Sequence, residues 1–390
     1  MSETPSPTTT CPSCGAAAPT GAKFCESCGT PLGGDAGPVA AAPAATEASP
    51  IDDLGSGPIS APTHRNLAAP AADAGPRPCL VCQGTVGADG YCETCGAKAP
   101  TERDHFRGTP APWVAGVCDR GIVHHRNEDA MALLASDAPG ERAVLVVLDG
   151  VSNSIDSDVA SLAGAKAALE ALRAPFPRGM GTPASRSSAV TQALGAAAAA
   201  ANAAVVSVTD PASTNPASAT FVVVVVEQGL LAYANIGDSR AYWLPDGGPA
   251  VQLTVDDSAA QQQMEAGVPR EVAETSPQAH AITKWLGRDA PDIAPRTGQL
   301  EVAGPGWLLV CSDGLWNYAS EPEALAAQVA AAGTAVPLDL ALALIAFANA
   351  QGGRDNITAA VARIEPAATV PDPGQNASEP ALDHQEESDG

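Results

Sequence analysis

The feature of this sequence that most constrains its fold is an apolar run that ends in an acidic residue and a glycine. Residues 144–150 read Val-Leu-Val-Val-Leu-Asp-Gly, and residues 307–314 repeat the pattern as Trp-Leu-Leu-Val-Cys-Ser-Asp-Gly. Such runs, rich in β-branched residues, are typical of buried strands. A third acid, Asp355, stands directly before another apolar run. Three separate strands that each bring an aspartate to one end (Asp149, Asp313 and Asp355) indicate a carboxylate cluster, and such a cluster requires bound cations.

The overall composition excludes several classes of function. The formal net charge of −24 disfavours nucleic acid and anionic membranes as partners. We see no apolar stretch that approaches the roughly 20 residues of a membrane span, and no secretory signal at the N-terminus. We therefore expect a cytoplasmic protein, and the Ala-, Gly- and Pro-rich composition points to a bacterial source.

Eight of the ten cysteines occur in four Cys-x-x-Cys pairs, a spacing typical of zinc ligands in a reducing compartment. Two such pairs supply the four thiolates of a tetrahedral zinc site, and the first set resembles the short zinc-ribbon family. A redox dithiol is the alternative, and the fourfold pairing argues against it. The two predicted zinc sites consist of Cys11, Cys14, Cys25 and Cys28 and of Cys79, Cys82, Cys92 and Cys95. The remaining Cys118 and Cys311 lie in apolar runs and are predicted to be buried thiols.

The domain organisation follows from changes in composition. Residues 33–78 contain eight prolines and no Phe, Trp or Tyr, which indicates a linker, and residues 366–390 contain six acids and no Lys or Arg, which indicates a disordered tail. The predicted order is a zinc ribbon (11–32), a linker (33–78), a second ribbon (79–98), a linker (99–112), a globular domain (113–365) and the acidic tail (366–390).

The globular part alternates between strand and helix patterns, which predicts a layered α+β fold. The expected strands are 114–117, 130–134, 143–148, 221–226, 230–236, 240–244, 299–302, 307–311 and 356–364. The expected helices are 157–172, 187–208, 256–266, 281–286, 324–332 and 338–350.

Five acidic motifs occur in an order that resembles the metal-dependent protein phosphatase family of PP2C type across roughly residues 113–365. The motifs are Asn127-Glu128-Asp129, Asp149-Gly150, Gly237-Asp238-Ser239-Arg240, Ser312-Asp313-Gly314 and Asp355-Asn356. A single Asp-Gly is usually a turn, but five motifs in this order, each beside an expected strand, are specific.

The resemblance implies a four-layer αββα sandwich of two antiparallel sheets, with a binuclear Mg²⁺ or Mn²⁺ centre at one end. Carried over by position, Asp149 bridges both metals, and Asp313 and Asp355 hold one of them. The Gly150 carbonyl and, through water, Glu128 serve the other metal. A third, weaker metal belongs at Asp238, although Asn317 stands where the family commonly has an aspartate. Oxygen ligands of this kind suit Mg²⁺ or Mn²⁺.

The sequence departs from the family at the position of its phosphate-binding arginine, which lies four residues before Glu128. His124 occupies that position here, and Arg126 lies nearby. A protonated histidine can bind a phosphate dianion, so both His124 and Arg126 are candidates for phosphate binding.

The expected function is hydrolysis of phosphoserine and phosphothreonine in proteins by a water activated at the binuclear centre, in opposition to a serine/threonine kinase. Two structural zinc ions and two Mn²⁺ or Mg²⁺ ions are the expected cofactors. Phosphorylated proteins, with the kinase, are the expected partners of a monomeric enzyme. The alternatives are a catalytically silent phosphoprotein-binding scaffold, supported by His124, and a zinc-ribbon nucleic-acid binder, which the charge disfavours.

Overall fold

The computed structural model describes residues 8–10, 17–19, 78–79, 82–87, 90–96, 99–151 and 154–365. The chain divides into two units, residues 1–73 and 74–390. In the first unit, strands β1 (Thr8–Thr10) and β2 (Ala17–Pro19) pair antiparallel. The predicted zinc ligands Cys11, Cys14, Cys25 and Cys28, the predicted linker up to residue 77 and the predicted acidic tail lie outside the described residues.

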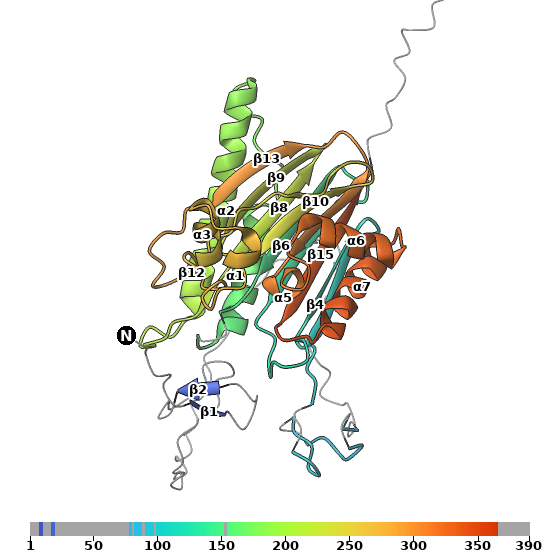
Figure 1. The fold of residues 1–390 in the computed structure, drawn as a ribbon. Helices are drawn as coiled ribbons and strands as arrows, with labels where there is room; N and C mark the ends of the chain where they lie inside the picture. The colour runs from blue at the N-terminus through green and yellow to red at the C-terminus, as the bar shows by residue number, and fades with distance from the viewer. Residues whose placement is uncertain are drawn as a thin grey trace, which may run out of the picture. The chain divides into compact units, whose positions relative to one another are not determined.

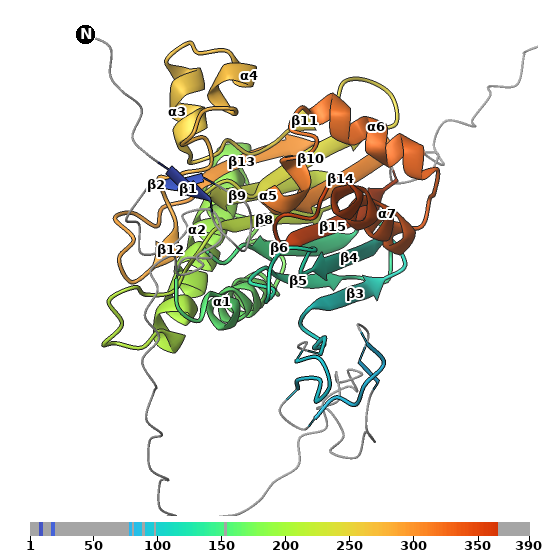
Figure 2. The same ribbon diagram turned by 60° about the horizontal axis from the view of Figure 1, so that its bottom comes forward.

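Two antiparallel sheets form the centre of the second unit (Figures 1 and 2). The six-stranded sheet runs in the order β11 (Val251–Gln252), β10 (Arg240–Pro245), β14 (Gly306–Cys311), β15 (Ile357–Ile364), β4 (Val114–Asp119) and β3 (His105–Ala111). The five-stranded sheet runs in the order β13 (Arg296–Glu301), β9 (Leu230–Ile236), β8 (Phe221–Glu227), β6 (Arg142–Leu148) and β5 (Ala130–Ala135). A short pair joins β7 (Ser218–Ala219) to β12 (Leu286–Gly287).

Helices cover the outer face of each sheet. The five-stranded sheet packs against α1 (Ser157–Ala171) and α2 (Pro183–Val208). The six-stranded sheet packs against α5 (Asp313–Trp316), α6 (Pro322–Ala332) and α7 (Pro337–Ala350). The helices α3 (Ala259–Glu265) and α4 (Arg270–Ala273) have a small apolar cluster of their own and project from the layers in Figure 2. The predicted four-layer αββα sandwich is therefore confirmed.

Strand β6 shows why the sequence pattern leads to this architecture. Val144, Val146 and Leu148 face the helices α1 and α2, whereas Leu145 and Val147 face the second sheet. Both faces of β6 are buried, so every position of the strand is apolar except Arg142. An uninterrupted apolar run is what such a central position requires.

Helix α2 is long and apolar enough to span a membrane by length and composition alone. The helix packs on α1 and on the five-stranded sheet through Leu194, Ala198 and Ala201, which are fully buried. This packing accounts for one apolar face of the helix, since 33% of its most apolar stretch is buried. The prediction from sequence that no apolar stretch approaches the length of a membrane span was wrong, because it overlooked the alanine-rich run of this helix.

All nine predicted strands are present, but two other predictions are wrong. Half of the predicted linker 99–112 is the edge strand β3, which pairs antiparallel with β4. Only Ala111 of β3 is buried, so the strand lacked an apolar pattern. The predicted helix 281–286 is instead an irregular segment that ends in β12, held by a bridge between Ser258 and Ile282.

Candidate metal centre

Asp149 is fixed at the end of β6 by its contacts with the start of β8. The backbone amide of Thr220 donates to the Asp149 carbonyl at 2.8 Å, and the Asp149 amide donates to the Thr220 hydroxyl at 2.9 Å. The next amide, of Gly150, donates to the carbonyl of Glu128 at 3.2 Å. Both sequence motifs therefore lie at the same end of the five-stranded sheet.

The six-stranded sheet brings its acids to one end through antiparallel pairing. Cys311, the last residue of β14, lies opposite Arg240 on one side and Ala359 on the other. Because neighbouring strands run in opposite directions, the end of β14 adjoins the starts of β10 and β15. This end of the sheet carries Asp313, Asp238 and Asp355.

The electrostatics show that the acids of the two sheets share one site. Burial raises the pKa of Asp149 well above its usual range, and the charges of neighbouring acids, including Asp313, Asp355 and Asp238, raise it further. Burial and the charges of Asp355 and Asp238 likewise raise the pKa of Asp313 well above its usual range. Like charges at short range disfavour ionisation, so these carboxylates form one electrostatically coupled cluster.

Asp238 and Asp355 differ in their surroundings. Burial raises the pKa of Asp238 to about 7, the charge of Asp256 raises it as well, and Arg240 acts in the opposite direction. The Asp355 side chain is 39% exposed, so the cluster opens to solvent on that side.

The donor atoms of this cluster fit a hard divalent cation. One Asp313 oxygen, Oδ2, accepts a hydrogen bond from Asn317 Nδ2 at 3.1 Å, whereas the buried Oδ1 has no hydrogen-bond partner in the described part of the chain. A side chain at Gly150 would lie 2.7 Å from the Glu128 carbonyl oxygen, so only glycine permits this close approach of the backbone. Carboxylate oxygens left without donors are the ligands that Mg²⁺ and Mn²⁺ prefer.

Glu128 lies beside the cluster, and its carboxylate is shared with other groups. Glu128 Oε1 accepts from Arg126 Nη2 at 2.7 Å and from the hydroxyl of Ser157 at the start of α1. The same Arg126 nitrogen donates to the Ser154 carbonyl at 3.2 Å. Arg126 is therefore engaged with Glu128 and the residues that lead into α1.

His124 lies between two acids of the site. Its Nε2 is 3.3 Å from Asp355 Oδ1, and its Nδ1 is 3.8 Å from Glu128 Oε2. The side chain is 26% exposed. The structure thus places His124 against the cluster and directs Arg126 toward α1, a difference that their positions in the sequence did not reveal.

Asp129 belongs to the cluster, and the sequence analysis gave it no role. Its Oδ2 accepts from the hydroxyls of Ser312 and Thr358, both at 2.7 Å, while its buried Oδ1 has no partner among the residues described. Burial, together with the charge of Asp355, raises the pKa of Asp129 to about 6. The signal in the sequence was the position of Asp129 as the third residue of the Asn-Glu-Asp motif. The structure shows its contacts with Ser312, directly after β14, and with Thr358 of β15 in the other sheet.

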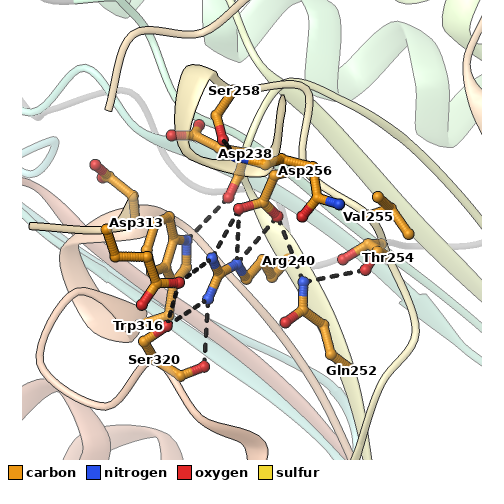
Figure 3. Close-up of polar contacts among 12 residues, drawn as sticks. Asp238, Arg240, Gln252, Thr254, Val255, Asp256, Ser258, Asp313, Trp316 and Ser320 are labelled. Carbon is orange, nitrogen blue, oxygen red and sulfur yellow. Dashed lines mark hydrogen bonds and ion pairs between the residues drawn. The ribbon is translucent and has the colours of Figure 1, made fainter. Parts of the chain in front are cut away.

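Arg240 connects the cluster to the α3–α4 segment (Figure 3). Its guanidinium, 2% exposed, makes a bidentate contact with Asp256 at 2.7–3.0 Å and lies 3.5 Å from the centre of the Trp316 ring. Trp316 Nε1 in turn donates to the Asp238 carbonyl at 2.9 Å. The buried cation thereby holds the backbone of one cluster residue in place through an indole ring.

A second, separate group of ligands lies in the segment 79–95. The sulfurs of Cys79, Cys82, Cys92 and Cys95 lie within 4.8 Å of one another. The amide of Gly84 donates to the Cys82 sulfur at 3.4 Å. Between them, Gln83 has a left-handed backbone conformation with φ of 63°. The predicted ligand set of the second ribbon is thus assembled, with glutamine in the position where glycine is usual.

The two remaining described cysteines are buried thiols, as expected. Cys118 and Cys311 are fully buried, and burial raises the pKa of both thiols well above the usual range. Neither is a reactive thiolate at neutral pH.

Comparison with known proteins identifies both parts of the chain. The model of the family Protein phosphatase 2C matches residues 123–336, and that of Double zinc ribbon matches residues 11–104. A putative protein phosphatase 2C-type of Streptococcus pyogenes is 38% identical over 146 residues, which are 37% of this chain and 56% of that protein. The serine/threonine protein phosphatase PstP of Mycobacterium tuberculosis is 30% identical over 250 residues, 63% of this chain and 44% of that protein.

The fold has the same relatives. The crystal structure of the Mycobacterium tuberculosis serine/threonine phosphatase PstP/Ppp superimposes with a TM-score of 0.52 and 28% identity, covering 65% of this chain and 98% of that structure. The chain spans about half the length of the curated relatives that it matches, 56% in the case of the streptococcal protein.

Proposed function

Because this chain belongs to the protein phosphatase 2C family and carries a double zinc ribbon, we propose that it is a metal-dependent protein serine/threonine phosphatase. The observation that carries the proposal is the acid cluster, in which burial and the charges of neighbouring acids, Asp355 among them, raise the pKa of Asp149 and Asp313. Such a cluster is stable in its ionised form only with cations bound. The named relatives, all protein phosphatases, support the reaction class.

We propose that Asp149 would hold two Mn²⁺ or Mg²⁺ ions and that Asp313 and Asp355 would complete the binding of one of them. The Gly150 carbonyl and, through water, Glu128 would serve the second ion. When bound, such ions lower the pKa of coordinated water and offset charge on the phosphoryl oxygens. Asp238, with Asn317 in place of a second acid, provides a weaker third position.

The protein groups then act by positioning. Ser157 and Arg126 hold the Glu128 carboxylate in a fixed orientation. The backbone amide of Glu128 donates to Asn356 Oδ1 at 2.7 Å. Between the two phosphate-binding candidates we favour His124, because it contacts Asp355 at the open side of the cluster while Arg126 is engaged with Glu128. A protonated imidazole there donates a hydrogen bond to a phosphate oxygen.

We propose that the protein acts on phosphoproteins in the cytoplasm, in opposition to a serine/threonine kinase. Residues 11–32 and 79–98 would form two zinc ribbons joined by the linker 33–78, and the grouped sulfurs of the second set support this. Joined to the catalytic domain in one chain, such ribbons would raise the local concentration of a bound kinase or substrate.

The test is manganese-dependent release of phosphate from a phosphothreonine peptide. We expect the wild-type protein to be active and Asp149→Asn to lose activity by more than about 100-fold, since a lost direct ligand costs more than a lost outer contact. Equal rates in the two proteins would contradict the proposal, and so would no activity in either.

One observation favours a second function. His124 stands where the family has an arginine, and a site that binds phosphate without hydrolysing it would make the domain a phosphoprotein-binding scaffold. Metal-dependent binding of a phosphothreonine peptide with no release of phosphate is the result expected from that function.

A further inference from the structure

A cavity of about 400 Å³ lies directly beside the acid cluster. One wall comes from the segment after α4, including Glu274 and His280, and another from α5 and the residues after it, including Trp316. Arg354 and Asp355 form the third wall. Because Asp355 belongs to both the cluster and the cavity, a substrate whose phosphate lies at the cluster has neighbouring residues within reach of this cavity.

The wall formed by Trp316 is rigid. The indole is 4% exposed, donates to the Asp238 carbonyl at 2.9 Å and packs under the Arg240 guanidinium at 3.5 Å. The ring of His280 lies 6.1 Å from the Trp316 ring. The cavity is therefore built from residues that the fold already holds, which gives it a defined shape.

The Glu274 carboxylate in the cavity wall is part of an ion-pair network. Glu274 Oε1 accepts from the Ser320 hydroxyl at 2.7 Å and lies 3.1 Å from an Arg270 nitrogen and 3.3 Å from an Arg240 nitrogen. Arg240 also pairs with Asp256 and Arg270 with Glu321, so these two arginines are engaged within the fold.

Arg354 supplies a positive charge at the edge of the cavity. Its backbone amide donates to the Tyr318 hydroxyl at 3.0 Å, which fixes the main chain, and its side chain is exposed. Within the described residues the Arg354 guanidinium has no ion pair and no hydrogen bond. The other arginines around the cluster, Arg126, Arg240 and Arg270, all form ion pairs with acids.

We propose that this cavity binds an acidic side chain of the substrate protein close to the phosphorylated residue, and that Arg354 is the specificity-determining residue that pairs with it. The inference rests on the proposed phosphatase function. The cavity is adjacent to the cluster, its Glu274 carboxylate is engaged in ion pairs, and the arginine that lines it, Arg354, has no ion pair within the described residues.

The test compares phosphothreonine peptides that differ only by Glu or Gln beside the phosphothreonine, each with saturating Mn²⁺. We expect the wild-type protein to favour the Glu peptide in kcat/KM by about fivefold, as for a partly exposed ion pair. Arg354→Gln should bring the ratio to about one, and Arg354→Glu should invert it. Arg178→Gln is the matched control, because Arg178 lies at the opposite end of the sheet, beside the β8–β9 turn, and should leave the ratio unchanged.

A second measurement separates this inference from the proposed function. Binding of the same two peptides, carrying a non-hydrolysable phosphonate in place of the phosphate, is followed by fluorescence anisotropy. A preference for the Glu peptide that Arg354→Gln removes supports the inference even if no peptide is hydrolysed, in which case the proposed function alone fails. Hydrolysis or binding with no preference in the wild-type protein, or with a preference that Arg354→Gln leaves intact, overturns the inference.

Discussion

The two groups of candidate metal ligands in this chain are built in opposite ways. The sulfurs of Cys79, Cys82, Cys92 and Cys95 come from a segment of 17 residues, whereas Asp149 and Asp355 are separated by 206 positions (355 − 149). The thiolates approach each other through local turns. The carboxylates approach each other only because two sheets stack with their strand ends aligned. A short motif is therefore sufficient to identify the first site, while the second needs the whole fold.

The consequence is a difference in how each site depends on its metal. Among the described residues of the ribbon, the buried cluster consists of Cys79, Val86 and Cys92, so zinc would supply most of its stability. The acid cluster lies on a domain with large apolar clusters between and outside its sheets. That domain can therefore fold without cations, although repulsion among its acids then lowers its free energy of unfolding.

The largest expected effect comes from removing one thiolate. Cys92→Ser should reduce the zinc content from about two ions per chain to about one and unfold the second ribbon, because zinc binding supplies on the order of 10 kcal/mol to such a module. Metal analysis and limited proteolysis measure these two results. The thermal unfolding of the phosphatase domain should not change.

The matched control is Glu93→Gln, an exposed neighbour that offers no thiolate. It should keep the full zinc content. A Cys92→Ser protein that retains about two zinc ions would show that the four sulfurs are not the ligands.

The next effect is the dependence of stability on pH, and its sign differs between the two sites. Burial raises the pKa of Asp238 to about 7 and that of Asp129 to about 6. The folded state therefore binds more protons than the unfolded state between about pH 4 and pH 7, so the free energy of unfolding of the manganese-free domain falls as pH rises through this range. We expect a loss of about 3 kcal/mol, largely removed by saturating Mn²⁺.

Urea unfolding at pH 5 and at pH 7.5, with and without Mn²⁺, measures this loss. The Asp238→Asn protein should show a flatter profile, because it cannot ionise at this position. Zinc retention by the ribbon should instead improve as pH rises, since thiolates bind the metal and thiols do not. A manganese-free domain that is more stable at pH 7.5 than at pH 5 would contradict the assignment of a cation-dependent cluster.

The smallest effect concerns a residue that acts at a distance. Arg240→Lys keeps the charge but loses the bidentate contact with Asp256 and the packing on Trp316, so we expect the domain to lose about 2 kcal/mol of stability. Affinity for Mn²⁺ should also fall, because Trp316 holds the Asp238 carbonyl. Zinc content should not change.

Arg173→Lys is the control for that substitution. Arg173 forms an exposed ion pair with Glu170, and its replacement should change stability by less than about 0.5 kcal/mol. If Arg240→Lys costs no more than Arg173→Lys, the buried network does not support the metal centre.

The sequence predicted the fold well where each element had a single physical cause. Strand β6 is buried on both faces, and its unbroken apolar run was sufficient to identify it. Strand β3 was missed because an edge strand with one buried residue carries no such pattern. The stretch 281–286 was misread as a helix, since a short apolar segment fits either structure until its neighbours are known.

The candidate site divides in the same way. The order of the acidic motifs identified Asp149, Asp313 and Asp355 before any geometry was available, whereas the choice between His124 and Arg126 depended on contacts between segments. The Ser157 hydroxyl at the start of α1 donates to Glu128 and accepts a hydrogen bond from Arg126, so Arg126 is held toward α1. No pattern within residues 124–128 contains that information.

The sequence alone predicted which residues bind metal and determined which strands must be buried, because thiolate spacing and apolar runs act over short segments. Tertiary structure alone decided that Asp129 joins the cluster, that His124 faces it, and that Arg354 lies beside a cavity with no ion pair among the described residues. The first two depend on side chains more than 180 positions apart, such as the Asp129 and Ser312 pair, which contact one another only when the sheets are stacked. The third depends on three segments, around residues 274–280, 314–320 and 354–355, that the fold brings together.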